Sequence, residues 1–86
     1  MSKTIHRQEY RILLSLLKQR RQGAGITQVE CSAALGRSQS YISDIERGVR
    51  RLDVVQLRDL CQVLRQDFVA FIRDFEKALS QRRRGH

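Results

Sequence analysis

The chain has 86 residues, enough for one domain with a modest hydrophobic core. Apolar residues make up 41% and charged residues 30%, a balance typical of a folded protein and not of a disordered one. There are 17 Lys and Arg against 9 Asp and Glu. The net charge of +8 favours a polyanionic partner, either nucleic acid or an acidic membrane surface, over a merely solvated basic surface.

Proline is absent, and the glycines stand between apolar patterns, which predicts helices joined by tight turns. The first helix is expected over residues 6–22, where an apolar stripe recurs at helical spacing: Tyr10, Leu13, Leu14 and Leu17. No apolar run approaches the ~18 residues that a membrane span needs, and the N-terminus has no signal-peptide core. We therefore expect a soluble, cytoplasmic protein.

A second helix is expected to begin at Thr27. Thr27 and Glu30 have the spacing of a capping box, in which each side chain accepts a hydrogen bond from the other residue's backbone N–H. The helix should end at Gly36, since glycine takes a left-handed turn without steric cost.

Ser38 is the expected N-cap of a third helix, which ends at Gly48. Two short helices joined so tightly must cross steeply, and the crossing lifts the start of the later helix out of the domain. A protruding helix fits the major groove of DNA. The pattern alone does not separate this arrangement from a plain helical hairpin.

Asp53 is the expected cap of a fourth helix that runs to about Arg65, and Asp67 is that of a fifth. The fourth helix should bury Val54, Leu57, Leu60, Cys61 and Leu64. The fifth repeats apolar residues at helical spacing: Phe68, Phe71, Ile72, Phe75 and Leu79. Strand patterns are absent, so we expect one all-α domain over residues 1–80, with the C-terminal helix over 67–80, followed by a disordered basic tail, residues 81–86.

The two cysteines, Cys31 and Cys61, fall among apolar helical positions and lack the spacing of metal ligands. We expect both to be buried, reduced thiols that pack as small hydrophobic groups. The only histidines, His6 and His86, lie near the ends. No glycine-rich phosphate loop or nucleophile–histidine–carboxylate set is present, so we expect neither a metal, a cofactor nor an enzyme.

Two segments resemble a known family: Thr-Gln-Val-Glu at 27–30 and Leu-Gly-Arg-Ser-Gln-Ser-Tyr-Ile-Ser-Asp-Ile-Glu-Arg-Gly at 35–48. They are similar to the lambda-repressor/Cro-like, or XRE-type, helix-turn-helix family of transcriptional regulators, and the resemblance covers roughly residues 13–64. It implies a compact five-helix domain that binds double-stranded DNA through its third helix. The chain departs from the family at Cys31, usually leucine, and at Ser32, usually alanine; both are small enough to pack.

The resemblance also implies roles for single residues. Gln28 would contact phosphate and brace Gln39, whose amide would lie flat against an adenine. Ser40 follows at a position that reaches a base edge. Asp44, one turn further on, either accepts from a cytosine amine or is repelled by nearby phosphates.

Glu46 matches a position that pairs in the family with an arginine near the end of the first helix, which suggests Arg21. Tyr41 is either a backbone contact or a packing residue. The full set expected to contact the DNA backbone is Gln28, Arg37, Ser38, Tyr41, Ser43, Arg47, Arg50 and Arg51.

One domain of this size covers about half an operator, so we expect a homodimer on a pseudo-palindromic site. The fifth helix is the candidate interface, through Phe68, Phe71, Ile72 and Phe75, unless it only closes the core of the monomer. The predicted function is that of a small transcriptional regulator, most simply a repressor. The alternative is an antitoxin or adaptor whose main role is to bind a protein partner.

Overall fold

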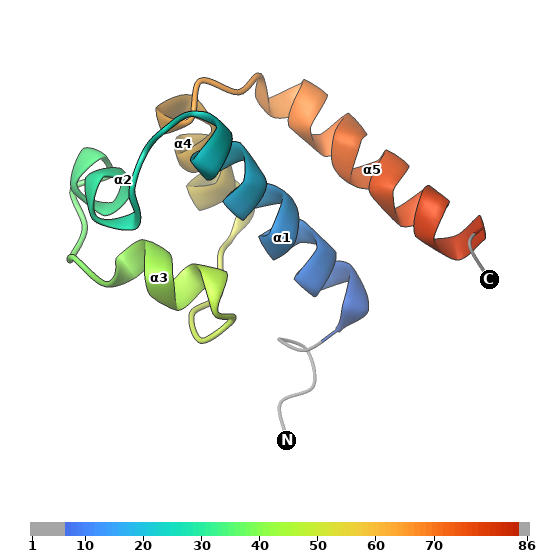
Figure 1. Cartoon of the computed structure of the whole chain (residues 1–86), viewed down its shortest axis with the longest axis horizontal. Helices are drawn as coiled ribbons and strands as arrows, with labels where there is room; N and C mark the ends of the chain where they lie inside the picture. Colours follow the sequence, from blue (N-terminus) through green and yellow to red (C-terminus); the bar gives the residue numbers. More distant parts are fainter. Residues whose placement is uncertain (1–6, 85–86) are drawn as a thin grey trace.

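The computed structural model describes residues 7–84. Over this range the chain forms five helices and no strand: α1 (Gln8–Gly23), α2 (Gln28–Ala34), α3 (Tyr41–Glu46), α4 (Val54–Val63) and α5 (Phe68–Arg84). Helix α1 lies at the centre and contacts α3 on one side and α5 on the other, while α2 packs on α3 (Figure 1). The all-α fold expected from the sequence is confirmed.

Three predicted helix starts are confirmed by their side-chain caps. Thr27 Oγ1 accepts from the Glu30 backbone N–H at 3.0 Å, and Glu30 Oε1 accepts from that of Thr27 at 2.9 Å. Asp53 Oδ1 accepts from the backbone N–H of its third helical residue at 2.8 Å, and Asp67 Oδ2 does the same at 2.9 Å. Each cap satisfies a first-turn N–H group that has no partner inside its own helix.

The predicted start of α3 is wrong. The helix begins at Tyr41, with Ser40 as its N-cap, and not directly after Ser38. The carbonyl of Ser38 accepts from the Tyr41 N–H at 3.0 Å, so residues 38–41 form a turn ahead of the helix. The side chain of Ser40 makes no capping hydrogen bond, because its backbone (φ −91°, ψ 1°) is not in the extended conformation that a capping residue adopts.

Helix α4 ends at Val63, before the predicted Arg65, because Arg65 has a left-handed backbone with φ 59°. The Gln66 N–H donates to the Cys61 carbonyl at 2.8 Å and closes the helix end. Gly25, Gly36 and Gly48 hold the equivalent left-handed positions after α1, α2 and α3. Arg65 is the one non-glycine residue between 7 and 84 with this conformation.

Helix α5 extends to Arg84, so residues 81–84, expected to be part of a disordered tail, are helical. The physical reason is that Gln and Arg propagate a helix well once it has formed, and no glycine or proline interrupts the chain before Gly85. Residues 85–86 of the expected tail, and His6 of the expected first helix, lie outside the described residues.

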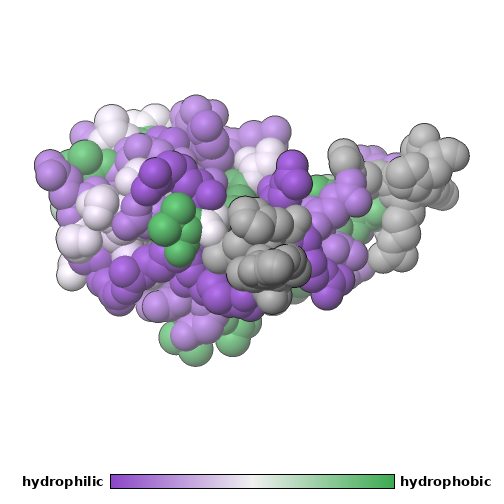
Figure 2. All heavy atoms as spheres, turned by 90° about the horizontal axis from the view of Figure 1, so that it is seen from below, coloured by the Kyte–Doolittle hydropathy of each residue, from purple (hydrophilic) through white to green (hydrophobic). Residues whose placement is uncertain are grey.

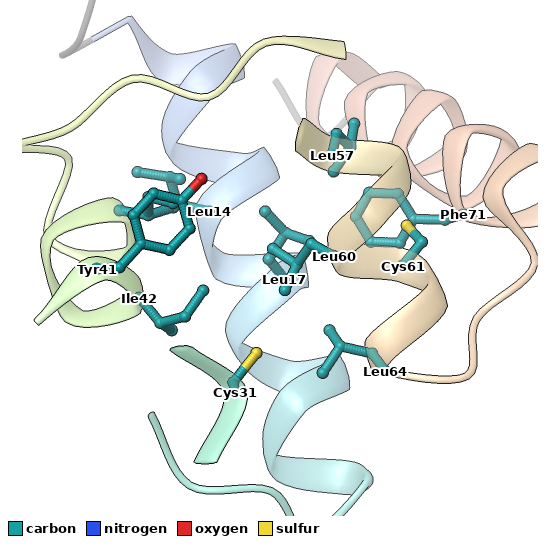
Figure 3. Packing of buried hydrophobic residues seen from close by; sticks show 11 residues of the cluster. Leu14, Leu17, Cys31, Tyr41, Ile42, Leu57, Leu60, Cys61, Leu64 and Phe71 are labelled. Carbon is teal, nitrogen blue, oxygen red and sulfur yellow. The ribbon is translucent and has the colours of Figure 1, made fainter. Parts of the chain in front are cut away.

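The core gathers apolar side chains from all five helices around α1 (Figure 3): Leu14, Leu17, Cys31, Tyr41, Ile42, Ile45, Leu57, Leu60, Cys61, Leu64 and Phe71. Both cysteines are buried and free, as expected. Val54 was expected to be buried but is 65% exposed. It is the first residue of α4 and precedes the turn that packs against the core. Within the described part of the chain, no helix combines the length and apolar character needed to cross a bilayer.

Candidate nucleic-acid interface

Helices α2 and α3 form the bihelical unit expected from the sequence. They are joined by residues 35–40, in which the Gly36 N–H donates to Ala33 O at 2.9 Å and the Arg37 N–H to Ser32 O at 3.0 Å. Helix α3 is held inward by Tyr41, Ile42 and Ile45, which are all buried. One face of α3 is therefore committed to the core and the other is left to solvent.

The chain that leads into α3 is exposed at Arg37, Ser38, Gln39 and Ser40. Ser43 and Asp44 are half-buried on the same helix, and Arg47 at its end is exposed. Of the three residues predicted to contact bases, Gln39 and Ser40 are thus exposed just ahead of α3, and Asp44 is half-buried in its first turn. Seen from below Figure 1, the surface that the described residues show is mostly hydrophilic, with apolar atoms in separate patches (Figure 2). Such a surface suits a charged, hydrated partner.

Asp44 is paired within its own helix. Its Oδ1 accepts from Arg47 Nη2 at 2.8 Å, three residues on. The pairing reduces the negative charge that Asp44 presents to solvent, and with it the repulsion expected near phosphate. The carboxylate retains lone pairs for a second donor.

Tyr41 is 4% exposed and belongs to the core, so the packing alternative describes its ring. Two arginines cover that ring: the guanidinium carbons of Arg37 and Arg50 lie 4.4 and 5.0 Å from its centroid. One precedes α3 in the chain and the other follows it. The Tyr41 ring therefore binds two cations beside the first turn of α3. The spacing of these residues along the sequence did not predict this arrangement.

Arg51, the remaining predicted backbone contact after α3, is exposed. Its guanidinium carbon lies 6.0 Å from the centroid of the Tyr10 ring on α1. Arg50 and Arg51 are adjacent in sequence but stack on different rings, so their charges are spread along the loop that leaves α3.

The pair predicted between Arg21 and Glu46 is confirmed. Arg21 Nε donates to Glu46 Oε2 at 2.7 Å and Nη2 to Oε1 at 3.1 Å, and the two side chains are only 9% and 7% exposed. Arg21 Nη1 also donates to the Ile26 carbonyl at 2.9 Å. This ion pair links the end of α1 to the end of α3.

The expected brace between Gln28 and Gln39 is wrong. The Gln28 side-chain nitrogen donates instead to Glu46 Oε1 at 2.9 Å, and among the described residues no hydrogen bond joins it to Gln39. The buried carboxylate of Glu46 is close to the start of α2 and takes the amide donor. Gln28 therefore belongs to the buried network of Arg21 and Glu46.

The candidate dimer residues on α5 divide into two groups. Phe71 is 1% exposed within the monomer core, and Phe68 and Ile72 pack against that core. These three residues therefore fit the alternative in which the fifth helix closes the core of the monomer. Phe71 is sealed inside the folded chain and unavailable to a partner, which corrects its assignment to the interface. Phe75 is half-buried, outside the cluster. Asp74, the residue before Phe75 in the chain, accepts through Oδ2 from Arg20 Nη2 on α1 at 2.8 Å.

A hollow of about 340 Å³ lies between α1 and the end of α3, lined by Arg11, Lys18, Glu46 and Arg47 among others. A hollow of about 860 Å³ is lined by the C-terminal ends of α1 and α4 and by α2, away from the exposed edge of α3. No group of three His, Cys, Asp or Glu side chains among these residues is placed to hold a metal ion.

Comparison with known proteins agrees with this geometry. Residues 12–69 match the model of a helix-turn-helix domain family. A solved structure, an XRE-family like protein from Pseudomonas syringae pv. tomato str. DC3000, is 44% identical and has a TM-score of 0.81, covering 90% of this chain and 94% of that one. Among curated proteins no significant match was found. The family model spans more than half of the chain, and the structural match covers nearly all of it, so the chain belongs to the XRE-type helix-turn-helix family of DNA-binding regulators.

Proposed function

We propose that this regulator binds a specific double-stranded sequence with α3 in the major groove, and that it represses transcription as a homodimer on a pseudo-palindromic operator in the cytoplasm. The observation that carries the proposal is the exposed edge formed by residues 37–40, which lead directly into α3, a helix whose inner face is buried. Exposed polar side chains held by a buried helix face are suited to reading base edges.

Gln39 is the principal base-reading residue in this proposal. It is exposed ahead of the first turn of α3, and a carboxamide matches the N6 and N7 groups of adenine in a bidentate manner. Ser40 reaches a neighbouring base edge. Asp44, with part of its charge held by Arg47, accepts from a cytosine amine.

Phosphates are bound by the cations around this edge. Arg37 and Arg50, stacked on Tyr41, flank the first turn of α3, while Arg47 and Arg51 extend the positive surface along the next loop. The hydroxyls of Ser38 and Ser43 and the start of α2 at Gln28 add polar groups. Such contacts supply affinity and register, and the net charge of +8 strengthens them at long range.

The dimer is proposed because one recognition helix reads only a half-site. Phe75 is half-buried and lies outside the core cluster, so it is the residue of the candidate interface that the monomer core does not use. The proposed two-fold axis therefore runs near α5.

Selection from random duplexes with the purified full-length protein tests the proposal. We expect recovered sites with inverted symmetry and half-sites about one helical turn apart. Sites with no shared sequence would contradict base reading. If the protein instead co-purified with one stoichiometric protein partner, the antitoxin or adaptor alternative would be supported.

A further inference from the structure

Ser32 is a fully buried polar residue of α2, with 0% of its surface exposed. Its Oγ accepts a hydrogen bond from the backbone N–H of Ile42, at 3.0 Å, in the first turn of α3. The N–H groups of a first helical turn have no partner within the helix, and the adjacent N-cap, Ser40, supplies none from its side chain. Among the described residues, the side-chain cap of α3 therefore comes from another helix.

Ser32 holds the chain at a second point. Its carbonyl oxygen accepts from the backbone N–H of Arg37 at 3.0 Å. Residues 38–41, which include Gln39 and Ser40, thus run between two amides that are both hydrogen-bonded to Ser32. The segment that carries the exposed edge has its entrance and its exit anchored on one buried residue.

We infer that Ser32 is a positioning residue that sets the orientation of the base-reading edge of α3. Helix α3 has six residues, far fewer than the ~12–15 that make an isolated helix even marginal in water, so tertiary contacts must hold its first turn. A hydroxyl in the preceding helix, α2, fixes both where α3 begins and how the two helices meet. The effect on DNA rests on the proposed function; the effect on α3 itself does not.

A purely stabilising role makes a different prediction. If the hydrogen bond contributed only to overall stability, losing it would loosen every core amide alike and would weaken specific and random DNA binding in parallel. If Ser32 positions α3, the loss is concentrated at Ile42 and the preceding turn, and the preference for the specific sequence falls.

The experiment compares Ser32→Ala with Cys61→Ala in the full chain. Cys61 is buried in α4 next to Phe71, so its replacement disturbs the core without touching the α2–α3 junction (Figure 3). Amide hydrogen exchange is measured at Ile42 and at Leu60. In Ser32→Ala we expect exchange at Ile42 to accelerate roughly tenfold more than at Leu60, the scale expected when a buried N–H loses its partner. Cys61→Ala should not produce this difference.

Affinity is then measured for a selected site and for a random duplex at one salt concentration. Ser32→Ala should reduce the ratio of the two affinities about tenfold, and Cys61→Ala should leave it unchanged. Ser32→Cys keeps a side-chain acceptor, although a larger and weaker one. Its affinity ratio should therefore lie between those of the wild type and Ser32→Ala, and it is used if the alanine variant folds poorly.

Equal acceleration at Ile42 and Leu60 in Ser32→Ala would overturn the positioning role. An unchanged affinity ratio, despite faster exchange at Ile42, would overturn its link to base reading. If the wild-type protein preferred no sequence, the proposed function would fail, and the exchange data would still decide what Ser32 does.

Discussion

Arg21 and Glu46 form a buried, two-pronged ion pair that ties the end of α1 to the end of α3, with distances of 2.7 and 3.1 Å. Gln28 completes the network from the start of α2, through Glu46. Three helices of the DNA-binding unit therefore meet at one carboxylate. Its satisfied hydrogen bonds offset the cost of keeping both charges out of water.

Removing one partner should be strongly destabilising. Arg21→Ala leaves the Glu46 carboxylate buried without its cation, so we expect the free energy of unfolding to fall by about 3–5 kcal/mol in urea titrations. Arg20→Ala is the matched control, since Arg20 pairs with Asp74 in a more exposed position and should cost only about 0–1 kcal/mol. Similar losses in the two variants would show that burial of the Arg21 pair is not what matters.

Gln39→Ala should weaken binding to a selected site by about 1–3 kcal/mol, because the bidentate contact to one base is lost. Binding to random duplexes should change little, since Gln39 contributes little to the phosphate contacts. Titrations of both duplexes at fixed salt measure the difference. If affinity for the selected site were retained, Gln39 would not be the residue that reads it.

Arg50→Ala is the contrasting variant in that experiment. It should weaken all duplexes alike and reduce the slope of log affinity against log salt by about 0.9, the value for one lost phosphate contact. Arg73→Ala removes an exposed arginine from α5, on the other side of α1 from α3, and should leave the slope unchanged (Figure 1).

Arg65→Gly should stabilise the fold. The left-handed backbone of Arg65 costs a residue with a Cβ about 1–2 kcal/mol, whereas the extra freedom of glycine in the unfolded chain costs about 0.5–1 kcal/mol. We expect a net gain of about 0.5–1 kcal/mol and a higher urea midpoint. Arg65→Ala keeps the Cβ and should give no such gain, which separates backbone strain from loss of the guanidinium.

Stability should decline in alkaline solution because of the two buried thiols. Burial raises the pKa of Cys31 and of Cys61 from 9.0 to about 11. The folded state therefore holds these protons more tightly than the unfolded state, so the thiol contribution is complete below pH 9 and is lost as pH rises toward 11. Ionisation of each thiol lowers the free energy of unfolding by at most about 3 kcal/mol, because each pKa unit corresponds to about 1.4 kcal/mol.

Urea titrations at neutral and alkaline pH measure this decline. The double variant Cys31→Ala/Cys61→Ala lacks both thiols and should lose less stability over the same interval, because only its other titrating groups remain. The same decline in both proteins would assign the effect to those groups. Near neutral pH the raised pKa keeps both thiols protonated and poorly reactive.

Features that depend on neighbouring residues were predictable from the sequence. The caps at Thr27, Asp53 and Asp67 formed as expected, because a capping hydrogen bond joins residues three apart. The buried positions of Leu14 and Leu17 on α1 followed from helical periodicity. The Arg21–Glu46 pair came from the family resemblance, since the two residues are far apart in sequence.

Features that join different helices were settled by packing in three dimensions. Ser38 was expected to cap α3, but Ser32 does so from α2, and Gln28 bonds Glu46 instead of Gln39. The sequence left open whether Phe71 belongs to a dimer interface or closes the monomer core, and the structure places it in the core. Local spacing specifies which hydrogen bonds and apolar faces a segment can offer. Which partner a buried donor or acceptor takes depends on what close packing brings within about 3 Å, and residues distant in sequence supply that partner.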